Sequence, residues 1–515
     1  MKRALCAAIA ALAMSAFAAD WVKIGEVRIA EPASMAASIS KICEMSGNQM
    51  VGAIAAAKVS EMPGVAFFGP AREGQAIEFP VFAKGRKDVE GDDLEYAVLY
   101  PVSTSKEAFM KRHKGCVETN GLVKARGGVL EWDEEDGDDE EDDDEDAEFS
   151  YVGFSKDGKW AAASDKPEQV RMALAGAKDR PFRKGTVASV LFGKKAIRQL
   201  SKALCECACD GDEKAAMAKA REILDGIEGL SASAGVYDSG LRFNASIKPV
   251  KGTKFDTLSS MPIEGRPLDF AATNSIGATV LSGVEPGASE AYRLRAVQEV
   301  LKAFAKNGLD LSPWLVAKSE SGVVVFSIDL RGMIAFFASD KGKMAAEKMG
   351  KSKSLQKDIQ ALQKDLQFQE IESLAPGKGA ARSRIDMVGY SPPTTLADRF
   401  VVIFPDAASK KPFYASAAVL SGTMREIIRA LMSVMPEEKK QGMIPMVAMI
   451  PGEGPGGMAA MSWRNGARIE YEMRVSADEV KSVCAVASAA FAAAAMNGLG
   501  GGDDGDDDDD EDDDD

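Results

Sequence analysis

The chain has 515 residues and a formal net charge of −16, with 79 Asp and Glu residues against 63 Lys and Arg. Two runs, Glu131–Glu148 and Asp503–Asp515, hold 27 of the acidic residues, so the rest of the chain is net +11. Because these runs contain almost no apolar residues, we expect both to stay disordered. The acidity therefore does not belong to the folded part. An aromatic content of 7% and the export signal described next argue against a nucleic-acid-binding protein.

The N-terminus has the pattern of a secretory signal peptide. Lys2 and Arg3 precede the short apolar stretch Ala4–Phe17, and Ala16-Phe17-Ala18 is an A-x-A cleavage site. We expect residues 1–18 to be removed on export. The compact, alanine-rich form is typical of bacteria and predicts a periplasmic or secreted protein. No later segment is long and apolar enough to predict a transmembrane helix.

Six cysteines remain after this cleavage, and in an oxidising compartment they are disulfide candidates. They are Cys43, Cys116, Cys205, Cys207, Cys209 and Cys484. Their pairing cannot be chosen from sequence. The close cluster Cys205, Cys207 and Cys209 is also a weak candidate for a copper or zinc site, although its spacing is shorter than that of known zinc motifs.

Two matched segment pairs predict an internal duplication. Tyr96–Phe109 reads YAVLYPVSTSKEAF and Phe400–Phe413 reads FVVIFPDAASKKPF, so both predict an apolar strand, an aromatic-Pro pair and a turn. Val190–Gly193 (VLFG) and Val419–Gly422 (VLSG) each lead into a helical stretch and then a hairpin.

His113 is the only histidine, and it lies in the basic stretch KRHKGC. Any Ser-His-Asp or Cys-His catalytic site would have to be built around this one residue. We interpret it as a surface histidine. A metal or redox role together with Cys116, or catalysis, is the alternative.

The acidic run Glu131–Glu148 lies between the two matched pieces of the first half, and we interpret it as an insertion in a surface loop. Its carboxylates are weak candidates for charge-driven calcium binding. The candidate residues are Asp138, Asp139, Glu140, Glu141, Asp142, Asp143 and Asp144. A solubilising role, or screening of the basic body by the acidic segments, is the alternative.

Four hairpins are predicted from residue alternation around a turn. The turns lie at Lys156–Gly158, Asp238–Gly240, Ser319–Gly322 and Asn465-Gly466. The strands Leu241–Ile247 and Ile469–Val475 carry alternating apolar residues on one face, which predicts antiparallel sheet with the other face in water.

Helices are predicted between these hairpins. Apolar residues recur at helical spacing in Leu294–Phe304, Leu355–Leu366 and Met424–Met435. Ser476-x-x-Glu479 predicts a capping box at the start of the last helix. Gly452–Gly457 matches the G-x-G-x-x-G pattern, but a hairpin strand follows instead of a helix, so we interpret it as a surface loop.

The order of helices and hairpins favours an α+β fold of two related modules, each an antiparallel sheet with packed helices. We place them at residues 19–262 and 264–500, followed by a disordered acidic tail at 501–515. No catalytic motif is complete, because the Ser-x-x-Lys matches lack partner motifs. The sequence therefore predicts a non-enzymatic envelope or secreted binding or scaffold protein, with no cofactor and an unknown partner. Low-affinity divalent-cation binding and a carboxylate-dependent glycan hydrolase are the alternatives.

Overall fold

The computed structural model describes residues 21–46, 63–84, 94–126, 149–198, 224–253, 256–257, 259–284, 288–320, 323–361, 381–390, 392, 394–434 and 456–485. The predicted signal peptide, both acidic runs with Asp138–Asp144, and the cluster Cys205, Cys207 and Cys209 lie outside these residues.

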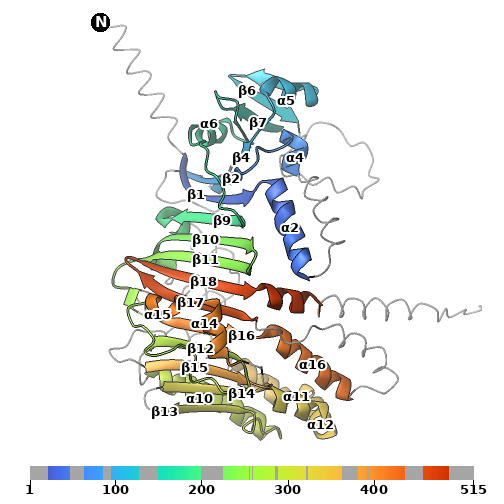
Figure 1. The fold of residues 1–515 in the computed structure, drawn as a ribbon, viewed down its shortest axis with the longest axis vertical. Coiled ribbons are helices and arrows are strands. Elements are labelled where there is room, and N and C mark those ends of the chain that lie inside the picture. Colours follow the sequence, from blue (N-terminus) through green and yellow to red (C-terminus); the bar gives the residue numbers. More distant parts are fainter. Residues whose placement is uncertain are drawn as a thin grey trace, which may run out of the picture.

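The described strands form one continuous sheet (Figure 1). The N-terminal half contributes β1 (Trp21–Ala30), β2 (Ala76–Lys84), β3 (Leu94–Tyr96), β4 (Val98–Pro101), β5 (Val117–Thr119), β6 (Leu122–Arg126), β7 (Phe149–Phe154), β8 (Trp160–Ser164), β9 (Thr186–Gly193), β10 (Ile227–Tyr237) and β11 (Gly240–Pro249). The C-terminal half contributes β12 (Ser275–Val284), β13 (Leu315–Glu320), β14 (Val323–Asp329), β15 (Ala381–Val388), β16 (Tyr414–Ala418), β17 (Met458–Asn465) and β18 (Arg468–Ser476).

The two halves meet where β11 pairs antiparallel with β18. Outward from this pair, the neighbours are β10, β9, β1 and β2 on one side and β17, β16, β12 and β15 on the other. Both β3 and β4 pair with β2, and from β4 the sheet continues to β8, β7, β6 and β5. Beyond β15 it continues through β14, which is parallel to β15, to β13. The predicted α+β class with antiparallel sheet is therefore confirmed, with one parallel pair that the sequence did not predict.

Helices lie at the ends of the strands and on the faces of the sheet (Figure 1). They are α2 (Pro32–Ser46), α4 (Pro63–Phe68), α5 (Lys106–Arg112), α6 (Pro167–Ala175), α10 (Ala288–Lys306), α11 (Leu330–Ala338), α12 (Asp340–Gly350), α14 (Leu396–Ile403), α15 (Ala407–Lys410) and α16 (Leu420–Val434). Residues 477–485 are also helical and directly follow β18.

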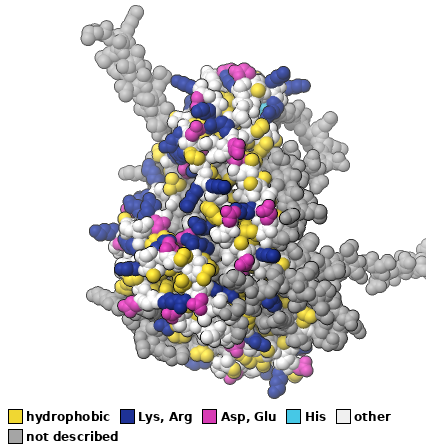
Figure 2. Space-filling model, viewed as in Figure 1, with side chains coloured by type: hydrophobic (Ala, Val, Ile, Leu, Met, Phe, Trp, Pro, Cys, Tyr) yellow, Lys and Arg dark blue, Asp and Glu magenta, His cyan; other side chains and the backbone are white. Residues whose placement is uncertain are grey.

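The two faces of the sheet differ in chemistry, as the alternation in β11 and β18 predicts. On one face, Leu241 lies opposite Val475 and Phe243 opposite Met473, so apolar rows cross the joint between the halves. The other face carries charged residues at the joint, and Figure 2 shows Lys and Arg side chains interspersed with Asp and Glu over much of the surface. Arg474 there pairs with Glu472 of the same strand at 2.8 Å. Burial does not follow this alternation, because Glu472 on the charged face is 5% exposed whereas Leu241 and Met473 of the apolar rows are only half-buried. The prediction that the charged face lies in water is therefore wrong at Glu472.

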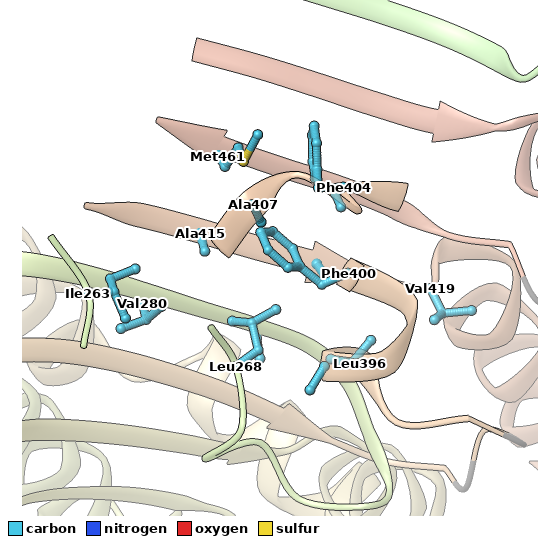
Figure 3. Packing of buried hydrophobic residues seen from close by; sticks show 14 of the residues in the cluster. Ile263, Leu268, Val280, Leu396, Phe400, Phe404, Ala407, Ala415, Val419 and Met461 are labelled. Carbon is cyan, nitrogen blue, oxygen red and sulfur yellow. The ribbon is translucent and has the colours of Figure 1, made fainter. Parts of the chain in front are cut away.

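A core in the C-terminal half holds α14 against the sheet. Leu396, Phe400 and Phe404 are fully buried and pack onto Ala415 of β16 and Met461 of β17 (Figure 3). Small alanines in the strands leave room for these large helix residues, so the two layers interlock at ordinary protein density. A separate core in the N-terminal half surrounds Tyr100 and Phe109.

The four predicted hairpins are confirmed as β7–β8, β10–β11, β13–β14 and β17–β18. One prediction is wrong: Phe400–Phe413 does not begin with a strand, since Phe400 lies within α14, whereas Tyr96–Phe109 begins in β3 and β4 as predicted. Apolar residues at consecutive positions suit a buried strand and a short buried helix equally well, so the sequence could not separate them.

The two segments of the second matched pair, VLFG and VLSG, do not occupy equivalent positions in the two halves of the sheet. In the β9–β10 and β16–β17 pairings, Phe192 lies opposite Leu230 and Ala418 lies opposite Met458. Leu230 lies seven residues before the end of β10, and Met458 lies seven residues before the end of β17. Because these two residues are equivalent, their partners Phe192 and Ala418 are equivalent as well. The VLFG and VLSG tetrapeptides are therefore offset by three residues in space.

The predicted capping box is half formed. The Glu479 backbone N–H donates to Ser476 Oγ at 3.2 Å, as expected at a helix N-terminus. The Glu479 carboxylate instead accepts bonds from Ser421 N at 2.8 Å and Ser421 Oγ at 2.9 Å. It thereby caps the first turn of α16, which ties the last described helix to an element of its own half.

Candidate functional site

A hollow of about 290 Å³ lies on the apolar face of the C-terminal half of the sheet. It is lined by Gly277, Ala278, Thr279, Ile385, Met387, Tyr414, Ser416, Ala417, Ala418, Met458, Ala460, Tyr471 and Met473. We call it the apolar hollow. Its residues come from β12, β15, β16, β17 and β18, so no short sequence motif encodes it.

The strand register explains the shape of the hollow. One row across the sheet runs from Ile385 through Thr279, Ser416 and Ala460 to Met473. The next row runs from Met387 through Gly277 and Ala418 to Met458. Small residues occupy the middle of both rows and long ones the rims, so the surface sinks along β12 and β16.

The rim residues are suited to a variable apolar ligand. Three of them are Met387, Met458 and Met473, and methionine side chains are unbranched and adapt to irregular shapes. Tyr414 and Tyr471 add rigid aromatic area with a polar tip. A ligand with an apolar body and a small polar group would match this lining.

Two hydroxyl groups of the hollow lie close to each other. Tyr414 Oη and Ser416 Oγ are 3.2 Å apart. Burial raises the pKa of Tyr471, and the nearby Tyr414 adds to this effect, so the Tyr471 phenol stays neutral near pH 7 and can donate or accept a hydrogen bond. The lining, which consists of described residues, includes no Asp, Glu, His or Cys, so it supplies no general base of the usual kinds.

A second hollow lies on the same face of the sheet in the N-terminal half. Its volume is about 420 Å³, and its lining is Val27, Phe79, Val81, Glu95 and Tyr96. Val27 lies opposite Phe79 in the β1–β2 ladder, and Tyr96 is 51% exposed. This hollow is wider and more open than the first, so we regard it as a weaker candidate site.

A third hollow, of about 240 Å³, lies beneath α2, where Ser34, Ser38 and Lys41 face Arg183 and Thr186. Glu31, at its edge, is already engaged, because its carboxylate accepts a bond from Ser34 N at 3.0 Å. Glu31 therefore caps the first turn of α2, and its role there is structural.

Two buried glutamates on β1 and β2 are the pair to consider for the alternative of a glycan hydrolase, which needs two positioned carboxylates. Glu26 and Glu78 are 6% and 2% exposed, and Arg180 Nη1 lies 3.0 Å from Glu26 Oε2 and 3.9 Å from Glu78 Oε2. Burial raises the pKa of Glu78. Lys23 and Arg180 outweigh burial at Glu26 and lower its pKa. Opposite shifts suit an acid–base pair, but neither carboxylate lines any of the three hollows, so we interpret the cluster as a structural ion network.

His113 is less exposed to water than a surface histidine would be. Its Nε2 lies 2.9 Å from the Phe67 carbonyl oxygen, and its ring packs against Phe109 with centroids 4.3 Å apart. Cys116 lies nearby, with Sγ 3.7 Å from the Met110 carbonyl oxygen. The imidazole is therefore held by the α5 core, which favours a structural role.

Only some of the residues predicted to form disulfides or metal sites belong to the described part of the chain. Cys43, Cys116 and Cys484 are not joined in disulfides in the structure. Among the described residues, no group of three or more His, Cys, Asp or Glu side chains is arranged to hold a metal ion. The calcium and Cys205-cluster candidates lie outside those residues and stay predictions.

Comparisons with known proteins provide no further guide. No family model matches the chain, and neither the curated proteins nor the solved structures contain a match. Within the described ranges, no helix is both long and apolar enough to cross a membrane.

Proposed function

We propose that this protein is an exported, non-catalytic binding or scaffold protein that holds an apolar ligand or peptide segment in the apolar hollow. The single observation that carries the proposal is the hollow itself, rimmed by Met387, Met458 and Met473 with the two tyrosines beside them. Concave, mostly apolar sites with a few converging polar groups are the usual form of binding sites.

The position of the hollow supports binding over catalysis. It lies on a sheet face where strand pairing holds the backbone of the lining residues in place, and its polar side chains are hydroxyls. Such groups can orient a ligand by hydrogen bonds, and the methionines can adapt to its shape. The apolar rows extend from the hollow to Phe243 of β11, so a ligand longer than the hollow could continue across the joint.

The proposal includes two related modules in one chain, and the antiparallel pairing of β11 with β18 supports this relationship. Gly240 and Arg468 each begin the second strand of a hairpin, and four residues further on Asn244 and Glu472 lie directly opposite each other. The two hairpins are thus related by a local two-fold axis. The matching strand order outward from the joint is what a duplicated and fused unit would produce.

The remaining features of the proposal rest on sequence. Residues 1–18 direct the chain to the periplasm or the cell exterior, and the acidic segments at 131–148 and 501–515 keep it soluble. The partner is an envelope or extracellular molecule, and it is not a nucleic acid.

A fluorescence titration tests this proposal. The probe is 1-anilinonaphthalene-8-sulfonate, which becomes bright in apolar sites, added to the purified full chain. Ala418 lies in the middle of the hollow, so Ala418→Phe should fill it and weaken probe binding at least about tenfold, or about 1.4 kcal/mol.

The matched control is Ala232→Phe, which adds the same ring to the same sheet face at a half-buried position of β10, outside the hollow. It should leave probe binding unchanged. Equal binding by the wild type and both variants would show that the apolar hollow is not the binding site.

A further inference from the structure

Two cysteines from opposite ends of the chain lie on neighbouring helices beside the joint of the sheet. Cys43 is in the last turn of α2, and Cys484 is in the helix 477–485 that follows β18. Both are half-buried, and neither is joined in a disulfide in the structure. They are 441 positions apart in sequence, so their closeness is produced entirely by the tertiary structure.

The β10–β11 turn holds both helices in place. Lys41 of α2 forms an ion pair with Asp238 in this turn. The Ala477 N–H, at the start of the last helix, donates to the carbonyl oxygen of the next turn residue, Ser239, at 3.1 Å. One turn of the chain therefore contacts both elements that carry the two thiols.

The position along the axis places Cys43 near the end of α2 that contacts the turn, two residues or about 3 Å beyond Lys41, although residues two apart do not share a helix face. Cys484 is seven residues, or about two helical turns, beyond Ala477 and so on the same side of its helix. Figure 1 shows the C-terminal end of α2 beside the short red helix after β18.

The pKa of Cys484 agrees with this arrangement. Burial raises the pKa of Cys484, and the Cys43 thiol raises it further. An effect of one thiol on another requires a short separation, because electrostatic interactions weaken with distance.

We propose that Cys43 and Cys484 form a disulfide that fastens α2 of the N-terminal half to the last described helix of the C-terminal half. The oxidant is a disulfide-bearing small molecule or oxidoreductase of the exporting compartment. One cysteine thiolate attacks the oxidant's disulfide and releases one thiolate from it. The second cysteine thiolate then attacks the mixed disulfide and releases the other. Two protein thiols lose two protons and two electrons, and the oxidant is reduced to two thiols.

The bond would have a structural consequence at the joint. Among the described strands, the β11–β18 pair alone joins the two halves, and α2 packs against β9 and β10 on one side of it while the last described helix follows β18 on the other. A covalent link between the helices resists separation of the halves and keeps α2 over the hollow beneath it.

Non-reducing peptide mapping tests the proposal. Purified, reduced full chain is oxidised with a glutathione redox buffer, remaining thiols are blocked with iodoacetamide, and the protein is digested with trypsin. We expect peptide 42–58 to be linked to peptide 482–515 as the main cross-linked species, and to be released by dithiothreitol. The oxidised wild type should also migrate faster than the reduced form in non-reducing electrophoresis.

Cys116→Ser is the matched control and should retain the cross-link, whereas Cys43→Ser and Cys484→Ser should each lose it and the mobility shift. Because the mapping uses the wild type, the test does not depend on whether a variant folds. Recovery of Cys43 and Cys484 as alkylated thiols, or of either one linked to a different cysteine, would overturn the proposal.

Discussion

The Gly240→Ala substitution should open the joint between the two halves. Gly240 has a φ of +122°, and a Cβ at this position would lie 2.0 Å from the Val475 carbonyl oxygen and 2.8 Å from Ala477 N. These are backbone atoms of β18 and of the next helix, so they cannot move aside as a flexible side chain can. The only relief is separation of β11 from β18 at this end of the ladder.

The expected cost can be worked out from these contacts. Holding a non-glycine residue at such a φ costs about 1–3 kcal/mol. Pulling the strand ends apart loses one or two ladder hydrogen bonds, at about 1 kcal/mol each. We therefore expect Gly240→Ala to lower the free energy of unfolding by about 2–5 kcal/mol in total.

Gly466→Ala is the matched control, because Gly466 occupies the turn of the other hairpin. Its φ is +59°, and a Cβ there would meet nothing within 4 Å. The substitution should cost only the left-handed backbone penalty, about 1–2 kcal/mol.

The assay is urea unfolding of both variants and the wild type, followed by tryptophan fluorescence. We expect the Gly240→Ala midpoint to fall well below that of Gly466→Ala, and an early transition to appear as the halves separate. Equal midpoints for the two variants would refute the steric argument at the joint.

Glu479→Ala should lower the free energy of unfolding by about 3 kcal/mol, because the buried carboxylate, which is 2% exposed, loses its two hydrogen bonds from Ser421. A double-mutant cycle with Ser421→Ala measures the contribution of the bond from the Ser421 hydroxyl. A coupling energy below about 0.5 kcal/mol would contradict this prediction. The lowered pKa of Glu26 means that its contribution to stability is present above about pH 4.5 and is lost as the pH falls through the lowered value. The raised pKa of Glu78 has the opposite sign, so Glu78→Gln should gain stability relative to the wild type as the pH rises from about 4 to 7. Thermal unfolding across that range checks this, and a constant difference would argue against it.

Local patterns predicted the hairpins well. The turns at Asp238–Gly240 and Asn465-Gly466 both appear in the structure, where they join β10 to β11 and β17 to β18. A hairpin depends on residues a few positions apart, so turn chemistry and alternation are sufficient to specify it. The same locality explains the error at Phe400, where a short apolar run suited both a strand and the helix α14.

The candidate site could not be predicted in the same way. The apolar hollow depends on the register of five strands drawn from Ser275 to Ser476, and its small central residues, Gly277 and Ala418, look ordinary in sequence. Glu479 was correctly expected near a helix N-terminus, but the sequence could not show that its carboxylate binds Ser421. Each of these contacts joins residues far apart in the chain.

The sequence by itself determined the α+β class, the hairpins and their apolar faces, because these follow from spacing and turn residues within short segments. Only the tertiary structure decided that both halves share one sheet through β11 and β18, that the helices carrying Cys43 and Cys484 both contact the β10–β11 turn, and that the apolar rows sink into a hollow along β12 and β16. The physical reason is that strand pairing and packing are selected by the complementarity of distant surfaces, and no local pattern records which distant surface will fit.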